Sequence, residues 1–485
     1  MRILCLALAA SLAGCAVGPD YQRPLLPDGV SAPAFKETGA WKAASPGTVD
    51  AAHPWWTGFG DPRLDALIDE ANLANQNLRL AEAQYREAQA LVQNAQAGWS
   101  PTLGLNVSGQ RSRSLSSAGV PVQGNTHAWS LQAAWEPDLW GRVRRAVEGA
   151  ADNAQASEAD LAAARLAVQS AVANDYIQLR MADAQQRLYD RTIEAYRKSL
   201  QITQSQYRVG VVTRADVDLA NTTLQSTQAL AIETQLTRRQ LEHAIAVLLG
   251  KTPSEFSIAP DDSLPSLPAV PMGVPSELLE RRPDIAGAER RVAAANAGIG
   301  YAQAAYYPTL SLTAAGGFAG AGFGNWFAAP GKVWALGAAV AQNLIDGGQR
   351  SAQVAQARAA FDASSASYRQ TVLAGFQEVE DNLAALDVLA QERQVQDGAV
   401  ASARNAERVS LSQFRAGTTT YLAVITAQTL ALNNERTALQ LQSRQFAAHV
   451  ALVKALGGGW SASQLQASAD ASPAADASAS SSNSR

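Results

Sequence analysis

Stretches in which apolar and small polar residues alternate predict β-strands in two separate parts of the chain. In the first stretch, single small or polar residues separate Leu103, Leu105 and Val107. Strands of about nine residues with one apolar face and aromatic ends are typical of transmembrane β-barrels, although the edge of a soluble β-sandwich alternates similarly. We expect two strands within about 101–136 and two within about 308–343. The later stretches carry the alternation on Trp129, Leu131, Ala133 and Trp135, on Leu310, Leu312 and Ala314, and on Trp334, Leu336, Ala338 and Val340.

The pattern changes to a helical period after each pair of strands. Residues 142–208 contain no proline, and they are rich in alanine, glutamine, leucine and arginine, which favour helices. A helix of this length extends about 100 Å. Soluble helical bundles rarely need elements this long, so we expect two long antiparallel helical hairpins. Their turns and returning helices are Gly210 with 214–249, and Gly417 with 421–456.

A shift of 207 residues aligns the two parts of the chain with each other. It places Pro101-Thr102-Leu103 on Pro308-Thr309-Leu310 and Gly210 on Gly417. We infer a tandem duplication in which each repeat contains a helix, two strands and a helical hairpin. The repeats span 62–250 and 269–457, and a proline-rich linker at 251–268 joins them. Proline excludes this linker from a long helix or a central strand.

The N-terminus has the features of an export and lipidation signal. Residues 1–14 contain one basic residue and a short apolar stretch, and Leu-Ala-Gly precedes Cys15. This arrangement is typical of a bacterial lipoprotein signal peptide, in which the cysteine carries a covalent lipid; the alternative is an ordinary signal peptide with an incidental cysteine. Residues 15–61 would then be a lipidated N-terminal segment. Residues 458–485 are mostly serine, alanine and aspartate, which predicts a disordered tail.

Composition excludes several other functions. The 39 Lys+Arg oppose 43 Asp+Glu, so bulk positive charge does not direct this chain to nucleic acid. The two cysteines, Cys5 and Cys15, both precede the body of the protein, and the four histidines form no pair at metal-ligand spacing. The sequence contains no recognisable catalytic motif. We therefore expect neither an enzyme nor a cofactor apart from the lipid on Cys15.

Four strands cannot close a sheet in lipid, because free edges would leave main-chain groups without hydrogen-bond partners. The chain must therefore oligomerise. Two chains would give eight strands and a barrel filled by side chains, whereas three would give twelve and a water-filled lumen. Small residues opposite the apolar faces favour three chains. These residues are Gly104, Ser108, Ser130, Ser311 and Thr313.

Four motifs carry a resemblance to a known family. The chain resembles the TolC-type outer-membrane factors of tripartite efflux systems, in their NodT/OprM-like lipoprotein branch, over about residues 16–460. The motifs are CAVGPDYQRP from Cys15, WWTGFGDP from Trp55, LLERRPDI from Leu278 and YPTLSL from Tyr307.

The resemblance implies an α+β membrane protein. In this family a homotrimer forms a twelve-stranded β-barrel, with four strands per chain, continuous with a long α-helical periplasmic tunnel. It implies an outer-membrane location and the role of exit duct for drugs or small toxic compounds. The implied partners are a periplasmic adaptor, an inner-membrane pump of the RND type and outer-membrane lipid. A rival reading is a structural coiled-coil lipoprotein that spans the periplasm without a pore.

The resemblance also implies that the two hairpin turns are the periplasmic tips, where the duct closes and the adaptor binds. Charged groups repeated around a threefold axis could hold a gate, although Asp216 is also favourable simply as an acidic residue at a helix N-terminus. The second tip has no carboxylate between Thr418 and Gln428, so its closure would depend on Tyr421, Leu422 or hydroxyl groups. Our candidate gate residues are Arg214, Asp216, Thr419, Tyr421 and Leu422. Our candidate adaptor contacts are Tyr207, Arg208, Gly210, Thr213, Phe414, Arg415, Gly417 and Thr420.

Overall fold

The computed structural model describes residues 16–25, 36, 54–261, 263–268, 281–321, 331–463 and 465. The chain divides into two compact units, each assembled from both repeats. Unit 1 contains Met1–Leu25, Gln84–Glu158 and Gly287–Arg369, and unit 2 contains Leu26–Ala83, Ala159–Ala286 and Gln370–Arg485. The signal peptide at 1–14 and Cys15 lie outside the described residues.

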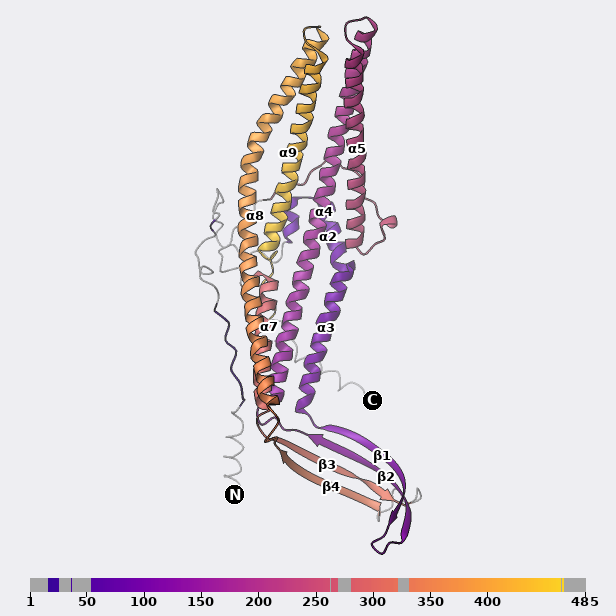
Figure 1. Ribbon diagram of the computed structural model, residues 1–485, viewed down its shortest axis with the longest axis vertical. Coiled ribbons are helices and arrows are strands. Elements are labelled where there is room, and N and C mark those ends of the chain that lie inside the picture. Colours follow the sequence, from indigo (N-terminus) through magenta and orange to yellow (C-terminus); the bar gives the residue numbers. More distant parts are fainter. Residues whose placement is uncertain are drawn as a thin grey trace, which may run out of the picture. The chain divides into compact units, whose positions relative to one another are not determined.

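Unit 1 contains an antiparallel sheet of four strands in the order β1-β2-β3-β4 (Figure 1). The register places Leu103 opposite Ala133, Ala133 opposite Ala314 and Ala314 opposite Leu336. The apolar positions of all four strands therefore share one face, and the small or polar positions share the other. The strands are β1 (Thr102–Leu115), β2 (Pro121–Trp135), β3 (Thr309–Gly320) and β4 (Lys332–Ala341).

Three of the four strands are longer than the expected length of about nine residues. The four strands contain 14, 15, 12 and 10 residues. The ladder between β1 and β2 continues past the apolar alternation to Leu115 and Pro121, because main-chain hydrogen bonds do not require alternating side chains. Similarly, β3 includes the glycine-rich residues 316–320.

Aromatic residues gather at the end of the sheet that adjoins the helices of unit 1. The indole nitrogen of Trp135 donates to the carbonyl oxygen of Trp99 over 3.1 Å. Trp140 donates to the carbonyl oxygen of Pro308 over 2.7 Å, and its ring stacks on Tyr307 with 4.8 Å between centroids. Such rings, apolar in body and polar at one edge, are suited to a membrane–water interface.

Unit 2 contains the ends of two helical hairpins that lie side by side, with their turns at the same end (Figure 1). Both long helices have 67 residues and both returning helices have 35. None of the helices in the described part of the chain combines the length and the apolar character needed to cross a bilayer. The hairpins are α4 (Arg142–Arg208) with α5 (Arg214–Leu248), and α8 (Gln349–Arg415) with α9 (Tyr421–Ala455).

Both repeats have a break in their leading helical part. In the first repeat, Asn75 divides α2 (Pro62–Ala74) from α3 (Gln76–Gln96). In the second, Arg282 is non-helical between the helical Arg281 and α7 (Pro283–Ala304), and the shift of 207 residues aligns it with Asn75. Asn75 causes the division, because its side chain accepts from the backbone of Asn77 and Leu78 and so starts a new helix.

Two arginines of unit 2 bind the linker to the first hairpin, and a buried carboxylate forms ion pairs with both of them. Arg238 donates to the carbonyl oxygen of Ile258 over 2.6 Å, and Arg180 donates to that of Ala259 over 3.1 Å. Asp183 lies between the two guanidinium groups, 3.1 Å from Arg180 and 2.7 Å from Arg238. One buried carboxylate therefore holds both arginines in the orientation that binds the linker.

The expectation of a disordered tail from residue 458 was wrong for its first part. Gly457 and Gly458 have positive φ angles and turn the chain after α9. Leu465 is buried and packs with Ala159 and Ala286, and Trp460 lies beside this cluster. The leucine and tryptophan in an otherwise small and polar segment supply the apolar surface that holds it. Residues 464 and 466–485 lie outside the described residues.

Candidate functional site

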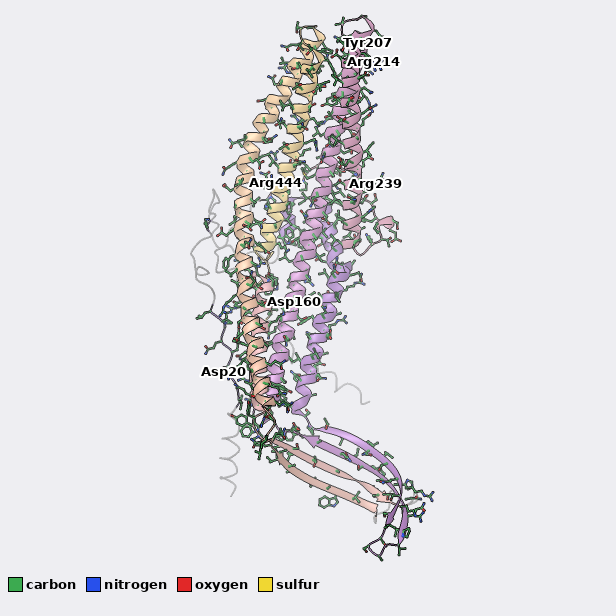
Figure 2. All side chains as sticks on the ribbon, in the orientation of Figure 1. Asp20, Asp160, Tyr207, Arg214, Arg239 and Arg444 are labelled. Atoms are coloured by element: carbon green, nitrogen blue, oxygen red, sulfur yellow. The ribbon has the colours of Figure 1, made fainter. Side chains whose placement is uncertain are left out.

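The first hairpin tip begins with a glycine-terminated helix. Gly210 has a φ of 76°, and its N–H donates to the carbonyl oxygen of Tyr207 over 3.0 Å. The next residue, Val211, donates to Gln206 over 2.9 Å, which completes the hydrogen bonding of the helix end. Figure 2 shows Tyr207 and Arg214 near each other at this tip. Tyr207 is exposed, as an adaptor contact requires.

The returning helix of the first tip starts with a capping box. Thr213 accepts a hydrogen bond from the Asp216 N–H, and the Asp216 carboxylate accepts from the backbone N–H of Thr213 over 2.9 Å. Arg214 does not contact Asp216 and instead pairs with Asp218 over 3.2 Å. Asp216 thus has a local structural role within one chain, while Arg214 and Asp218 remain exposed to solvent.

The second tip repeats the glycine turn but lacks the cap. Gly417 has a φ of 72° and donates to the carbonyl oxygen of Phe414 over 3.0 Å. Thr420 occupies the N-cap position, yet its side chain makes no capping hydrogen bond. The third residue of this helix is Ala423, which offers no carboxylate to complete a capping box.

Two candidate residues of the second tip lie inside the protein. Phe414 and Tyr421 are each 2% exposed, with 5.1 Å between ring centroids, and they pack with Ala220 of the first hairpin. Burial raises the pKa of Tyr421 to about 12. The placement of Phe414 on an adaptor-binding surface was therefore wrong, and Tyr421 acts by joining the hairpins rather than by facing a lumen.

The remaining candidates lie at the surface of the tips or partly buried there. Leu422 follows the buried Tyr421 and is 61% exposed, so it extends away from the cluster. Thr419 is half-buried. Those that are exposed at the tips are Arg208, Gly210, Thr213, Arg415, Gly417 and Thr420.

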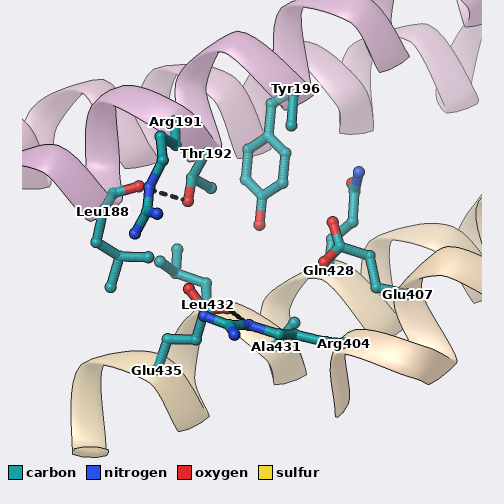
Figure 3. A pocket seen from close by; sticks show the side chains of 11 residues that line it. Leu188, Arg191, Thr192, Tyr196, Arg404, Glu407, Gln428, Ala431, Leu432 and Glu435 are labelled. Atoms are coloured by element: carbon teal, nitrogen blue, oxygen red, sulfur yellow. Dashed lines mark hydrogen bonds and ion pairs between the residues drawn. The ribbon is translucent and has the colours of Figure 1, made fainter. Parts of the chain in front are cut away.

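A polar chamber between the hairpins, with a volume of about 330 Å³, was not predicted from the sequence (Figure 3). Burial raises the pKa of Glu407, and the nearby carboxylate of Glu435 raises it further. Glu435 forms an ion pair with Arg404. Gln428 donates to Ser199 over 3.1 Å, but its buried amide oxygen has no partner in the described part of the chain.

One sequence signal could have located the chamber. Tyr421 and Val424 are buried positions on α9, and Gln428 occupies the buried position one heptad after Tyr421. A polar residue at such a position indicates a polar cluster in the packing between helices. The facing groups on α4 and α8 depend on how the hairpins align, which the sequence pattern of α9 does not reveal.

The comparison with protein families decides which class of proteins this arrangement represents. The family model described as "Outer membrane efflux protein" matches residues 67–251 and 274–458. The chain belongs to this family. As an outer membrane efflux protein, it is located in the outer membrane, and its two matched segments contain the strands and the helical hairpins of the two repeats.

Relatives of this outer membrane efflux protein are similar over nearly their whole length. Toluene efflux pump outer membrane protein TtgC of Pseudomonas putida is 31% identical over 477 residues, which cover 97% of this chain and 98% of the relative. Pyoverdine export outer membrane protein OpmQ of Pseudomonas aeruginosa is 31% identical over 450 residues, covering 90% and 93%. The solved structure of the outer-membrane channel OprN matches with a TM-score of 0.85 and 30% identity, covering 92% and 100%.

Proposed function

We propose that three copies of this outer membrane efflux protein form the passive exit duct of a tripartite pump. The two free edges of the sheet carry the proposal. Within the described residues, β1 and β4 each pair with one neighbour only, and every residue of both strands is exposed. An unpaired strand edge is unstable in lipid, so β4 of one chain would pair with β1 of the next until the ring closes.

The two faces of the sheet support a water-filled lumen. One face carries the exposed apolar side chains of Leu103 and Leu336, as contact with lipid requires. On the other face, Asn106 lies opposite Ser130, and Ser130 lies opposite Gly317. Three chains give twelve strands, a number that leaves space inside the barrel.

A passive duct needs partner proteins that deliver the cargo and supply the energy for export. We propose that a periplasmic adaptor binds the exposed tip residues and that an inner-membrane pump of the RND type supplies the energy. Relatives named for toluene efflux and pyoverdine export support small organic compounds as cargo. We propose that Cys15 carries the lipid anchor and that the chain moves its cargo without catalysing a reaction.

Planar lipid bilayers containing the purified protein test the pore directly. We expect discrete conductance steps, whereas a structural spacer would give none under any voltage or salt condition. A ring of acidic groups in the lumen should increase cation selectivity, so Ser130→Asp should shift the reversal potential. Ser254→Asp adds the same charge at an exposed linker position and serves as the matched control. Equal reversal potentials in both variants would contradict the lumen-facing placement of Ser130.

A further inference from the structure

A second pocket, of about 430 Å³, lies in unit 1 next to the start of the described chain. The N-terminal segment, the end of α7 and the first turns of α8 form its walls. Its lining residues are Val17, Gln303, Tyr306, Tyr307, Ser351, Val354, Ala355 and Arg358.

The N-terminal wall of this pocket is held in place by several contacts. The N–H of Val17 donates to the carbonyl oxygen of Trp140 over 3.1 Å, and the ring of Trp140 stacks on Tyr307. Arg145 donates to the carbonyl oxygen of Val17 over 3.3 Å. Gly18 has a φ of 108°, and a Cβ at this position would lie 2.4 Å from Cα of Gly300. The backbone therefore passes the pocket along a path that only glycine permits.

The pocket lies beside the residues that lead into strand β3 of the sheet. Tyr306 and Tyr307 come shortly before β3, which starts at Thr309. The guanidinium group of Arg350 lies 5.3 Å from the ring centroid of Tyr306. This contact orients the Tyr306 ring, which forms part of the pocket wall. Tyrosine at the end of a membrane-embedded strand marks the level of the lipid headgroups and ester groups. An occupant of this pocket would therefore lie at the depth where ester groups are found.

The lining combines apolar surface with hydrogen-bond donors. Val17, Val354 and Ala355 can contact methylene groups. The side chains of Gln303 and Arg358 have no hydrogen-bond or ion-pair partner in the described part of the chain, and both can donate to ester carbonyl oxygens. A glyceryl group with ester-linked acyl chains presents both kinds of surface.

We propose that this pocket binds the glyceryl ester portion of the lipid attached to Cys15. Cys15 precedes the pocket-lining residue Val17 by two residues, and two residues of chain span at most about 7 Å. The thioether lipid is thus tethered beside a pocket that matches its chemistry. This inference rests on the proposed lipidation of Cys15. It gives residues 16–25 the role of presenting the anchor at a fixed place on the protein.

Photocrosslinking in native membranes tests the pocket. Cells would be fed palmitate that carries a diazirine near its carboxyl end and an alkyne for enrichment, and the crosslinked peptides would be mapped by mass spectrometry. We expect crosslinks from the lipid on Cys15 to the peptides containing 303–307 or 351–358. Label on Cys15 with crosslinks only to other sites would overturn the pocket alone. Absence of label on Cys15 would overturn the lipidation and the pocket together.

Four variants, one of them a matched control, sharpen the test. A crosslink that persists in Cys15→Ala would come from a free phospholipid and would contradict the proposal. Ala355→Trp should fill the pocket and reduce the crosslink, whereas Gln353→Trp, on the opposite face of α8, should leave it unchanged. Loss of the charged donor in Arg358→Gln should reduce the yield about tenfold. Unchanged yields in both Ala355→Trp and Arg358→Gln would overturn the site.

Discussion

At the scale of single residues, the two arginines that bind the linker share one buried carboxylate. Asp183 is 3% exposed and forms ion pairs with both Arg180 and Arg238, which in turn bind the linker. Removing one partner from a buried pair leaves uncompensated charge, which costs far more than breaking a surface pair.

We therefore expect Asp183→Ala to destabilise the protein by about 3–5 kcal/mol. Thermal unfolding followed by circular dichroism would measure the change. Asp218→Ala removes an acidic residue from the exposed pair with Arg214 and should cost less than about 1 kcal/mol. Similar unfolding temperatures for the two variants would show that Asp183 does not hold the two arginines.

His449 should make stability depend on pH. Burial lowers its pKa to about 4, and its ring lies 5.5 Å from that of Phe59. The unfolded chain binds a proton below about pH 6.5, whereas the folded chain resists it, so stability falls as the pH decreases from about 6.5 to about 4. The loss should reach about 3 kcal/mol, and His449→Gln should remove it. His243→Gln, at an exposed position, is the control; an equal acid response in both variants would contradict the prediction.

At the scale of elements, the two tips use the same glycine turn but different helix starts. The first tip has the capping box of Thr213 and Asp216, while the second relies on the packing of Phe414 and Tyr421. The charge and the capping role of Asp216 can be separated, because asparagine retains a side-chain acceptor and alanine does not.

If a ring of Asp216 carboxylates contributes to the gate, Asp216→Ala and Asp216→Asn should both change the cation selectivity or the resting conductance. Only Asp216→Ala should also lose about 1 kcal/mol from the helix start. Single-channel recordings would measure the first effect and hydrogen exchange of α5 the second. Wild-type conductance in both variants would show that Asp216 is only a helix cap.

A substitution that removes buried packing at the second tip should open that tip. Tyr421→Ala removes a buried ring between the hairpins and should cost about 3 kcal/mol, which increases hydrogen exchange at the tip and raises resting conductance. Tyr421→Phe should retain most of the packing. Leu422→Ala changes the exposed neighbour and should affect exchange little. If Tyr421→Ala and Leu422→Ala gave the same exchange rates, the cluster would not hold the tip closed.

The sequence predicts local elements better than contacts between them. The absence of proline and the glycine turns indicate the extent of α4 and the return at Arg214. Alternation places Leu103 and Leu336 on the same face, as the strand register requires. The burial of Phe414 could not be predicted in this way, because it depends on which face of one hairpin meets the other. The lack of a reciprocal capping box at the second tip was predictable, since Ala423 has no acceptor side chain, but the missing hydrogen bond of the Thr420 side chain has no signal in the sequence.

At the scale of the whole molecule, the proposal is that one chain supplies a third of a pore. The sheet of four strands has free edges at β1 and β4 within the described residues. The apolar face can contact lipid while the polar face contacts water only if the sheet closes around a lumen. Twelve strands meet this requirement with an open interior, whereas eight would be filled by side chains.

Native mass spectrometry of the detergent-purified protein tests this claim most directly, because it counts the chains in the assembled particle. The proposal predicts a stable trimer as the dominant species, and the trimer should persist when the activation energy in the instrument is raised. A stable monomer or dimer as the dominant species would contradict the closed twelve-stranded barrel and the exit duct built on it.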